Sequence, residues 1–300
     1  MSNDSARRIR SYHLVLPMIS PLMGIPLIMA LIAIGETQVS PGPPFQSSNT
    51  VSTGIYNVLV MALIMAIATY VIYSLVRRGL IRAFEALKDV LLSIVVISST
   101  AFFVITYVYG FNITPLMGYP TLALIAVLSA LIIYASLKPN NMFVRALAIG
   151  SYSSMAGVIL TIALPTWTVV LLLVALPIYD IIMVYKGLLG RLVTELSKYG
   201  EGRYPLLRGL ILDMDGLGIG VGDLVLYSLL TSFTVLEYEY HGYPAMIGLI
   251  AAMASILGIF IGLLITLWYL LPIKKYAPAL PIPLLLGSTP LIYLALRLMP

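Results

Sequence analysis

The sequence predicts an all-α, polytopic membrane protein with nine transmembrane helices. Of its 300 residues, 60% are hydrophobic and only 10% are charged, whereas soluble domains carry about 25% charged residues. Apolar runs of about 18 residues or more, long enough to cross a bilayer as a helix, recur along the whole chain. Helices close their backbone hydrogen bonds internally, as lipid requires, and the alternating pattern of an outer-membrane barrel is absent from the sequence.

Nine apolar segments carry this prediction, and each is interpreted as one span. They are residues 14–34, 55–76, 90–109, 119–137, 143–163, 167–187, 217–236, 244–271 and 278–298. The first follows the basic sequence Arg7-Arg8-Ile9-Arg10, but it exceeds the roughly 7–15 residues of a signal-peptide core, so we interpret it as a span. The eighth is the longest, and we expect it to tilt or to fray.

The basic residues follow the alternation of these spans. Sixteen of the 17 lysine and arginine residues precede the first span or lie in every second connection, and only Arg297 falls on the other side. Because positive charge gathers in cytoplasmic connections, we expect the N-terminus in the cytosol and the C-terminus outside. One missed or false span would break this alternation, which therefore favours nine spans.

We predict a single membrane domain over residues 1–300, divided by its longest connection. A six-span part covers residues 1–188, a flexible cytosolic loop covers 189–216, and a three-span part covers 217–300. No internal repeat is visible in the sequence, so the inverted-repeat organisation of many transporters is not expected.

Two aspartates, Asp180 and Asp223, stand inside otherwise apolar segments of the sixth and seventh spans, while the other acidic residues fall in tails, connections or span edges. A charged side chain in hydrocarbon costs at least about 2.5 kcal/mol, so an intramembrane acid indicates a functional site. Asp180 precedes Lys186 by about six residues, and Asp223 follows the start of its span by about six, at about 1.5 Å of helix per residue. Both are therefore expected at one depth, roughly 9 Å below the same membrane face.

Two neighbouring carboxyl groups in a medium of low dielectric do not both ionise easily, so one keeps its proton and the other serves as a base. Such a pair can activate water and protonate a peptide carbonyl, as in aspartic proteases. A proton- or cation-coupled transporter or a leak channel is equally compatible with the acids alone. Gly220 and Gly222, which flank Asp223, are expected to clear room for a substrate backbone. For the earlier glycines, Gly216 and Gly218, simple helix packing is an equal alternative.

Three short motifs stand at defined places on the predicted spans: Tyr179-Asp180 on span six, Gly220-Val221-Gly222-Asp223 on span seven and Pro278-Ala279-Leu280 at the start of span nine. Together and in this order, they resemble the signatures of the presenilin and signal peptide peptidase family of intramembrane aspartyl proteases. The inferred orientation also matches presenilin, whereas signal peptide peptidases are inverted. The chain is similar to a compact microbial, archaeal presenilin homologue, which implies the cell membrane of a prokaryote.

This resemblance implies a presenilin-like fold and a Gly-x-Gly-Asp-type aspartic endopeptidase that cuts transmembrane helices, with Asp180 and Asp223 as the catalytic pair. The residues that it implies as site-shaping or substrate-binding are Tyr179, Gly220, Gly222, Pro278, Ala279 and Leu280. The connection between spans six and seven is far shorter than in presenilins and has no evident hydrophobic plug, so self-cleavage and obligate partner subunits are not expected. A prepilin-peptidase-like protease is an alternative, because it shares Gly-x-Gly-Asp, but it would lack Pro-Ala-Leu.

No metal, cofactor or nucleic acid is expected. The absence of cysteine excludes a thiol nucleophile and Cys-ligated metal. His13 and His241 are predicted on opposite sides of the membrane, and neither a His-Glu-x-x-His nor a Gly-x-Ser-x-Gly motif occurs, which disfavours zinc and serine proteases. The expected partners are transmembrane-helix substrates and the lipid bilayer, while homo-oligomer formation stays open.

Overall fold

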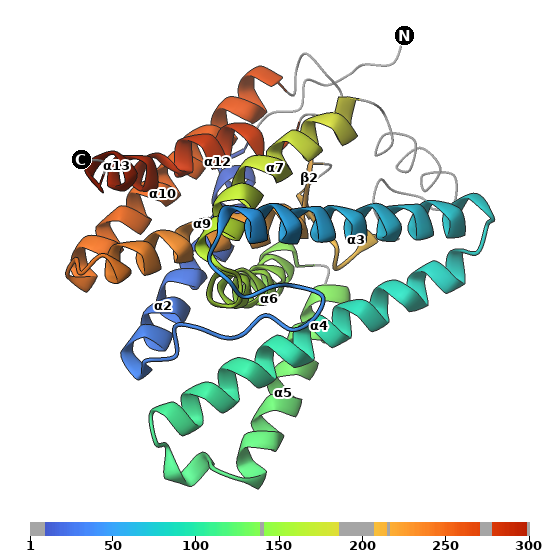
Figure 1. Ribbon diagram of the computed structural model, residues 1–300. Helices are drawn as coiled ribbons and strands as arrows, with labels where there is room; N and C mark the ends of the chain where they lie inside the picture. Colours follow the sequence, from blue (N-terminus) through green and yellow to red (C-terminus); the bar gives the residue numbers. More distant parts are fainter. Residues whose placement is uncertain (1–9, 139–140, 186–206, 215–216, 271–277, 299–300) are drawn as a thin grey trace.

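The computed structural model describes residues 10–138, 141–185, 207–214, 217–270 and 278–298 (Figure 1). These residues form a helical bundle with one short hairpin. The helices and helical turns are α1 (Tyr12–Val15), η1 (Leu16–Met18), α2 (Ile19–Ile34), α3 (Val51–Arg77), α4 (Ile81–Gly110), η2 (Thr114–Leu116), α5 (Tyr119–Leu137), α6 (Met142–Ala163), α7 (Thr166–Tyr185), α9 (Val221–Tyr240), α10 (Ala245–Ile265), η5 (Thr266–Leu270), α12 (Pro281–Gly287) and α13 (Thr289–Leu298). The strands are β1 (Ile211–Met214) and β2 (Leu217–Gly220).

Each predicted span has a helical counterpart among the described residues, which confirms the all-α class. Three of the spans are irregular: the first is α1, η1 and α2 in succession, the eighth ends in the π-helical turn η5, and the ninth bends by 44° between α12 and α13. Six of the described helices are long and apolar enough to cross a membrane, or seven if the bent pair counts as one span. α9 falls outside this group because it carries acidic and hydroxyl side chains.

Local signals in the sequence set several helix ends. The side chain of Thr50 accepts a hydrogen bond from the Thr53 amide at the start of α3, and Asn141 does the same for Phe143 at the start of α6. Such caps satisfy amides that have no partner inside the helix. α2 ends at Gly35, whose left-handed φ of 79° suits a residue without a Cβ atom.

The seventh span begins later than predicted. Residues Leu217–Gly220 form β2, which pairs antiparallel with β1 so that Ile211 lies opposite Gly220 and Met214 opposite Leu217. Glycines at 218 and 220 disfavour a helix here, and the alternating burial of β1 is typical of a strand. Asp223 consequently lies in the first turn of α9, and not about six residues into the span as predicted.

The predicted cytosolic loop, residues 189–216, lies mostly outside the described residues. Its described part, residues 207–214, contains β1 and is ordered by pairing with β2. The hairpin thus leads directly into α9.

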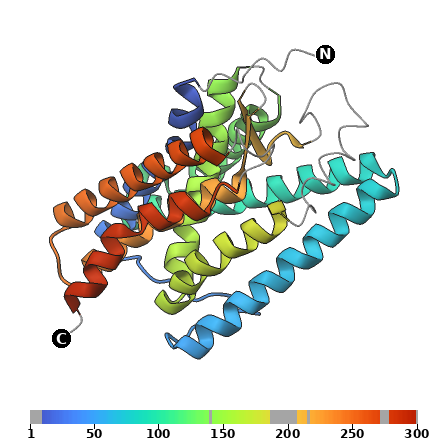
Figure 2. The same cartoon turned by 90° about the horizontal axis from the view of Figure 1, so that it is seen from above.

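α9 lies at the centre of the bundle, in contact mainly with α2, α6 and α10 (Figure 1). Every side chain from Leu226 to Val235 is buried. A helix that is buried on all sides belongs to a core rather than to a lipid-facing surface. By contrast, α3 lies at the edge of the bundle, and α7 packs chiefly against α3 and α12 (Figure 2).

The crossing of α6 and α9 depends on Gly157. A Cβ atom added at this position would lie 2.6 Å from the carbonyl oxygen of Val225 and 2.8 Å from the amide nitrogen of Leu229. Both atoms belong to the backbone of α9, so neither can rotate away, and the two helices approach this closely only because the residue is glycine.

We expect Gly157→Ala to destabilise the protein by about 1–3 kcal/mol, because overpacking forces two backbones apart. Thermal unfolding in detergent measures this effect. Gly42→Ala is the matched control, because an added Cβ there meets nothing within 4 Å and its φ is not left-handed. Equal melting temperatures for the two variants would contradict the close crossing.

Candidate active site

The structure brings Asp180 and Asp223 together. Asp180 lies on α7 and Asp223 in the first turn of α9, both are partly buried, and their carboxyl groups interact electrostatically. The sequence placed them at one depth on neighbouring spans without establishing contact. Their meeting depends on the packing of α7 against α3 and α12 rather than on any local feature of either segment.

The Pro-Ala-Leu motif lies against Asp180. The backbone N–H of Leu280 donates a hydrogen bond to Oδ2 of Asp180 at 3.1 Å, and the backbone of Ala279 also interacts with this carboxyl group. Leu280 is the N-cap residue of α12, whose first residue is Pro281. The helix therefore starts three residues after Pro278, later than the predicted start of the span. Because the motif stays outside the helix, its amide groups are free to face the carboxylate.

Tyr227 connects α9 to the same motif. Its hydroxyl donates to the carbonyl oxygen of Ala279 at 2.7 Å, and the side chain is fully buried. It interacts electrostatically with both Asp223 and Asp180. Tyr227 was not among the predicted site residues, although a signal was present: it follows Asp223 by four positions, which places both on one face of a helix.

The two glycines near Asp223 leave space in different ways. A Cβ atom added at Gly222 would meet nothing within 4 Å, and one added at Gly220 would meet only the carboxyl group of Asp223, at 3.4 Å from Oδ2. Gly222 is exposed. Both positions are compatible with the predicted room for a substrate backbone.

Tyr179 is partly buried beside Asp180. Within the described part of the chain, no hydrogen bond joins its hydroxyl to either carboxyl group. Its predicted role in shaping the site therefore has no polar contact to support it.

We expect Tyr227→Phe to reduce the activity of this site about three- to tenfold. The substitution keeps the ring but removes the donor to Ala279, and one such hydrogen bond contributes about 0.5–1.5 kcal/mol. The measurement compares the rate constant of peptide cleavage by the purified variant with that of the wild type. Tyr293→Phe is the control, because Tyr293 lies exposed on α13. Equal rates for Tyr227→Phe and the wild type would show that this hydrogen bond does not order the site.

No group of three or more histidine, cysteine, aspartate or glutamate side chains among the described residues could hold a metal ion. His13 and His241 bind different backbone carbonyls, those of Met214 and Glu237 respectively. Among the described residues, the candidate site therefore consists of Asp180 and Asp223 with the backbone amides that contact them.

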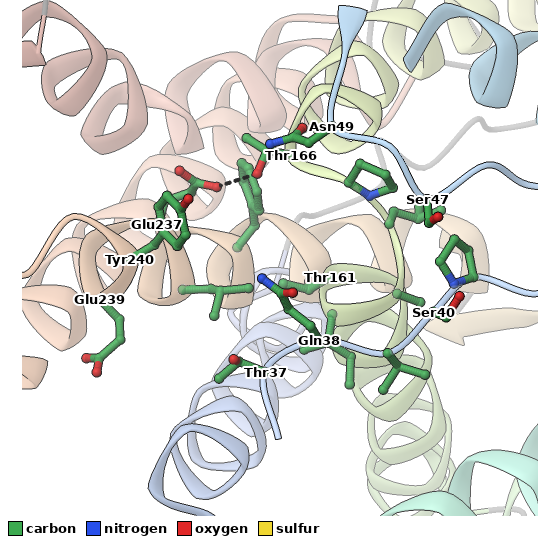
Figure 3. Close-up of a pocket in the computed structure, with 18 residues that line it drawn as sticks. Thr37, Gln38, Ser40, Ser47, Asn49, Thr161, Thr166, Glu237, Glu239 and Tyr240 are labelled. Carbon is green, nitrogen blue, oxygen red and sulfur yellow. Dashed lines mark hydrogen bonds between the residues drawn. The ribbon is translucent and has the colours of Figure 1, made fainter. Parts of the chain in front are cut away.

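A cavity of about 550 Å³ lies elsewhere, at the far end of α9 (Figure 3). It is lined by the connection after α2, the junction of α6 with α7, and the last turns of α9. Glu237 accepts a hydrogen bond from Thr166 there, at 3.1 Å. Asp223 and Glu237 are separated by roughly 21 Å of helix, at about 1.5 Å per residue, so this cavity is not the site of the aspartates.

Two comparisons with known proteins agree on a relationship, and no protein-family model matches the chain. Presenilin-B of Dictyostelium discoideum is 34% identical over 129 residues, which cover 41% of this chain and 25% of that protein. The chain thus matches about a quarter of the length of this curated relative. A solved structure described as a presenilin family intramembrane aspartate protease superposes with a TM-score of 0.61 at 17% identity, over 95% of this chain and 98% of the other.

The structural likeness extends over nearly the whole chain and therefore establishes the fold, whereas the sequence likeness covers a shorter segment. Together they confirm the resemblance that the three motifs predicted. The chain has the fold of this presenilin-family protease and is similar in sequence to part of Presenilin-B.

Proposed function

We propose that the chain is an intramembrane aspartyl protease of the Gly-x-Gly-Asp type that hydrolyses peptide bonds within the transmembrane helices of membrane proteins. The observation that carries this proposal is the convergence of all three motifs: Asp223 interacts with Asp180, and Asp180 accepts the N–H of Leu280. A prepilin-peptidase-like enzyme would lack Pro-Ala-Leu, which here contacts one of the acids.

In the proposed mechanism, one of the two aspartates, Asp180 or Asp223, acts as a general base and the other as a general acid. The ionised carboxylate removes a proton from water, and the protonated one donates its proton to the carbonyl oxygen of the scissile bond. The oxygen of that water attacks the carbonyl carbon, which gives a tetrahedral intermediate with two hydroxyl groups. The C–N bond then breaks: the leaving nitrogen takes up the proton that the first carboxylate removed from water, and one hydroxyl group returns a proton to the other carboxylate. The hydrogen bond from Leu280 and the interaction of Gly220 with Asp223 hold the two groups in place for these transfers.

The orientation follows from the distribution of basic residues. With 16 of 17 lysine and arginine residues on one side, the positive-inside rule places the N-terminus in the cytosol and the C-terminus outside the cell membrane. The aspartates then lie near the cytosolic face. The proposed substrates are membrane-protein helices, and the chain is proposed to act without obligate partner subunits.

The decisive test is cleavage by the purified chain in liposomes with a transmembrane peptide as substrate. We expect two fragments, identified by mass spectrometry, whose masses sum to that of the peptide plus one water. Proton or cation flux through the same liposomes is measured in parallel. Proton or cation flux without peptide fragments would contradict the proposed protease activity and favour a transporter or channel.

A further inference from the structure

The hairpin before α9 is held to the bundle through its backbone. The Nη2 atom of Arg145, on α6, donates a hydrogen bond to the carbonyl oxygen of Asp213 at 2.9 Å. The Nε2 atom of His13, on α1, lies 3.0 Å from the carbonyl oxygen of Met214. Two helices far apart in the sequence thus contact successive carbonyls at the end of β1.

The contacts of His13 define its tautomer. The backbone N–H of Arg10 can only donate, and it lies 3.0 Å from Nδ1 of His13, so Nδ1 is the acceptor. The carbonyl of Met214 can only accept, so Nε2 carries the proton. The ring is 7% exposed. It therefore acts as a fixed link between the start of the first span and the hairpin.

A third side chain holds the other end of β1. The hydroxyl of Tyr152, on α6, donates to the carbonyl of Gly209, and Tyr152 is 3% exposed. Gly209 has a left-handed φ of 85°, which turns the chain into the strand. The hairpin is thereby bound to α1 and α6 at both ends of β1.

The hairpin in turn positions Asp223. The N–H of Val221 donates to the carbonyl of Leu210 at 2.9 Å, which extends the pairing of the strands up to the first residue of α9. Gly220 is the N-cap residue of α9, and its backbone amide interacts with the carboxyl group of Asp223. A shift of β1 would therefore move Gly220, and with it the carboxyl group.

We propose that His13, Arg145 and Tyr152 are positioning residues, which fix the β1–β2 hairpin so that Asp223 is held in its reactive geometry. This inference rests on the proposed function, because it concerns the proposed catalytic pair. None of the three side chains touches either aspartate through a described contact, and each acts through the backbone of the hairpin.

The kinetic test uses two variants with small changes in volume, His13→Leu and Tyr152→Phe. We expect kcat to fall about tenfold to a hundredfold, because a misplaced reacting group slows the chemical step. KM should stay within about twofold of the wild-type value. His13→Gln should restore most of kcat, because its amide nitrogen can donate to Met214. His241→Leu is the control: it removes a histidine that also contacts a backbone carbonyl, at the other end of α9.

Hydrogen–deuterium exchange supplies a readout that does not need activity. We expect residues 209–221 to exchange faster in His13→Leu and Tyr152→Phe, with α6 and α10 unchanged. Unchanged exchange of the hairpin, or faster exchange throughout the bundle, would overturn the proposal whatever the kinetics. An unchanged kcat alongside a loosened hairpin would also overturn it. If the wild type makes no fragments, the proposed function fails, and exchange alone decides whether these side chains hold the hairpin.

Discussion

Asp180→Asn and Asp223→Asn are each expected to reduce cleavage at least about 10⁴-fold, the scale seen when one member of a catalytic group is removed. Asparagine has nearly the same shape but can neither take a proton from water nor donate one as a carboxylic acid does. Fragment formation from a transmembrane peptide, quantified by mass spectrometry, measures the loss. Either variant with substantial activity would remove that aspartate from the proposed mechanism.

These two variants should remain folded. The amide oxygen of asparagine at position 180 can still accept the N–H of Leu280, 3.1 Å away from Oδ2 in the wild type. Thermal unfolding in detergent is the check, and we expect melting temperatures close to that of the wild type. Asp89→Asn is the matched control for cleavage, because Asp89 lies on α4, outside the candidate active site, and its side chain is 49% exposed. It should retain the wild-type rate.

Ala279→Trp is expected to reduce cleavage of a long transmembrane substrate about a hundredfold, the scale associated with misplacing reacting groups by about 1 Å. A substrate helix must unwind before attack, because a helical carbonyl is hydrogen-bonded and shielded, and an extended segment can pair with an edge of the enzyme. The proposed path runs between Ala279 and the open space at Gly222, where an added Cβ meets nothing within 4 Å. An indole at 279 would narrow this path.

A small inhibitor directed at the two aspartates distinguishes a blocked substrate path from a damaged active site. Labelling by this inhibitor should fall much less than cleavage of the long substrate in Ala279→Trp. Ala123→Trp is the control, because Ala123 is exposed on α5, away from the site. Cleavage of the long substrate at the wild-type rate by Ala279→Trp would show that the Pro-Ala-Leu motif does not border the substrate path.

The packing of α7 explains why the motif matters for Asp180. α7 contacts mainly α3 and α12, and the central helix α9 has α2, α6 and α10 as its main neighbours. The position of Asp180 relative to Asp223 is therefore set largely through α12 and the hydrogen bond from Leu280. A short motif without any acidic or basic side chain thus joins the two helices that carry the acids.

The sequence alone determined the membrane class, the number and order of the helical segments, and the two acids with their neighbouring motifs. These features depend on local properties: the length of apolar segments, the cost of a charge in lipid and the identity of adjacent residues. The bend between α12 and α13 lies at Gly287-Ser288-Thr289-Pro290, where glycine, serine and proline are typical causes of a kink, so the sequence carried a signal for it that hydropathy does not record.

The contacts that build the site came only from the tertiary structure. Leu280 and Asp180 are 100 positions apart, Tyr227 and Ala279 are 52 apart, and His13 and Met214 are 201 apart. No local periodicity records which residues meet across such separations. Likewise, LGIG at 217–220 reads as the start of an apolar span, and it becomes a strand because β1 supplies hydrogen-bond partners for its backbone.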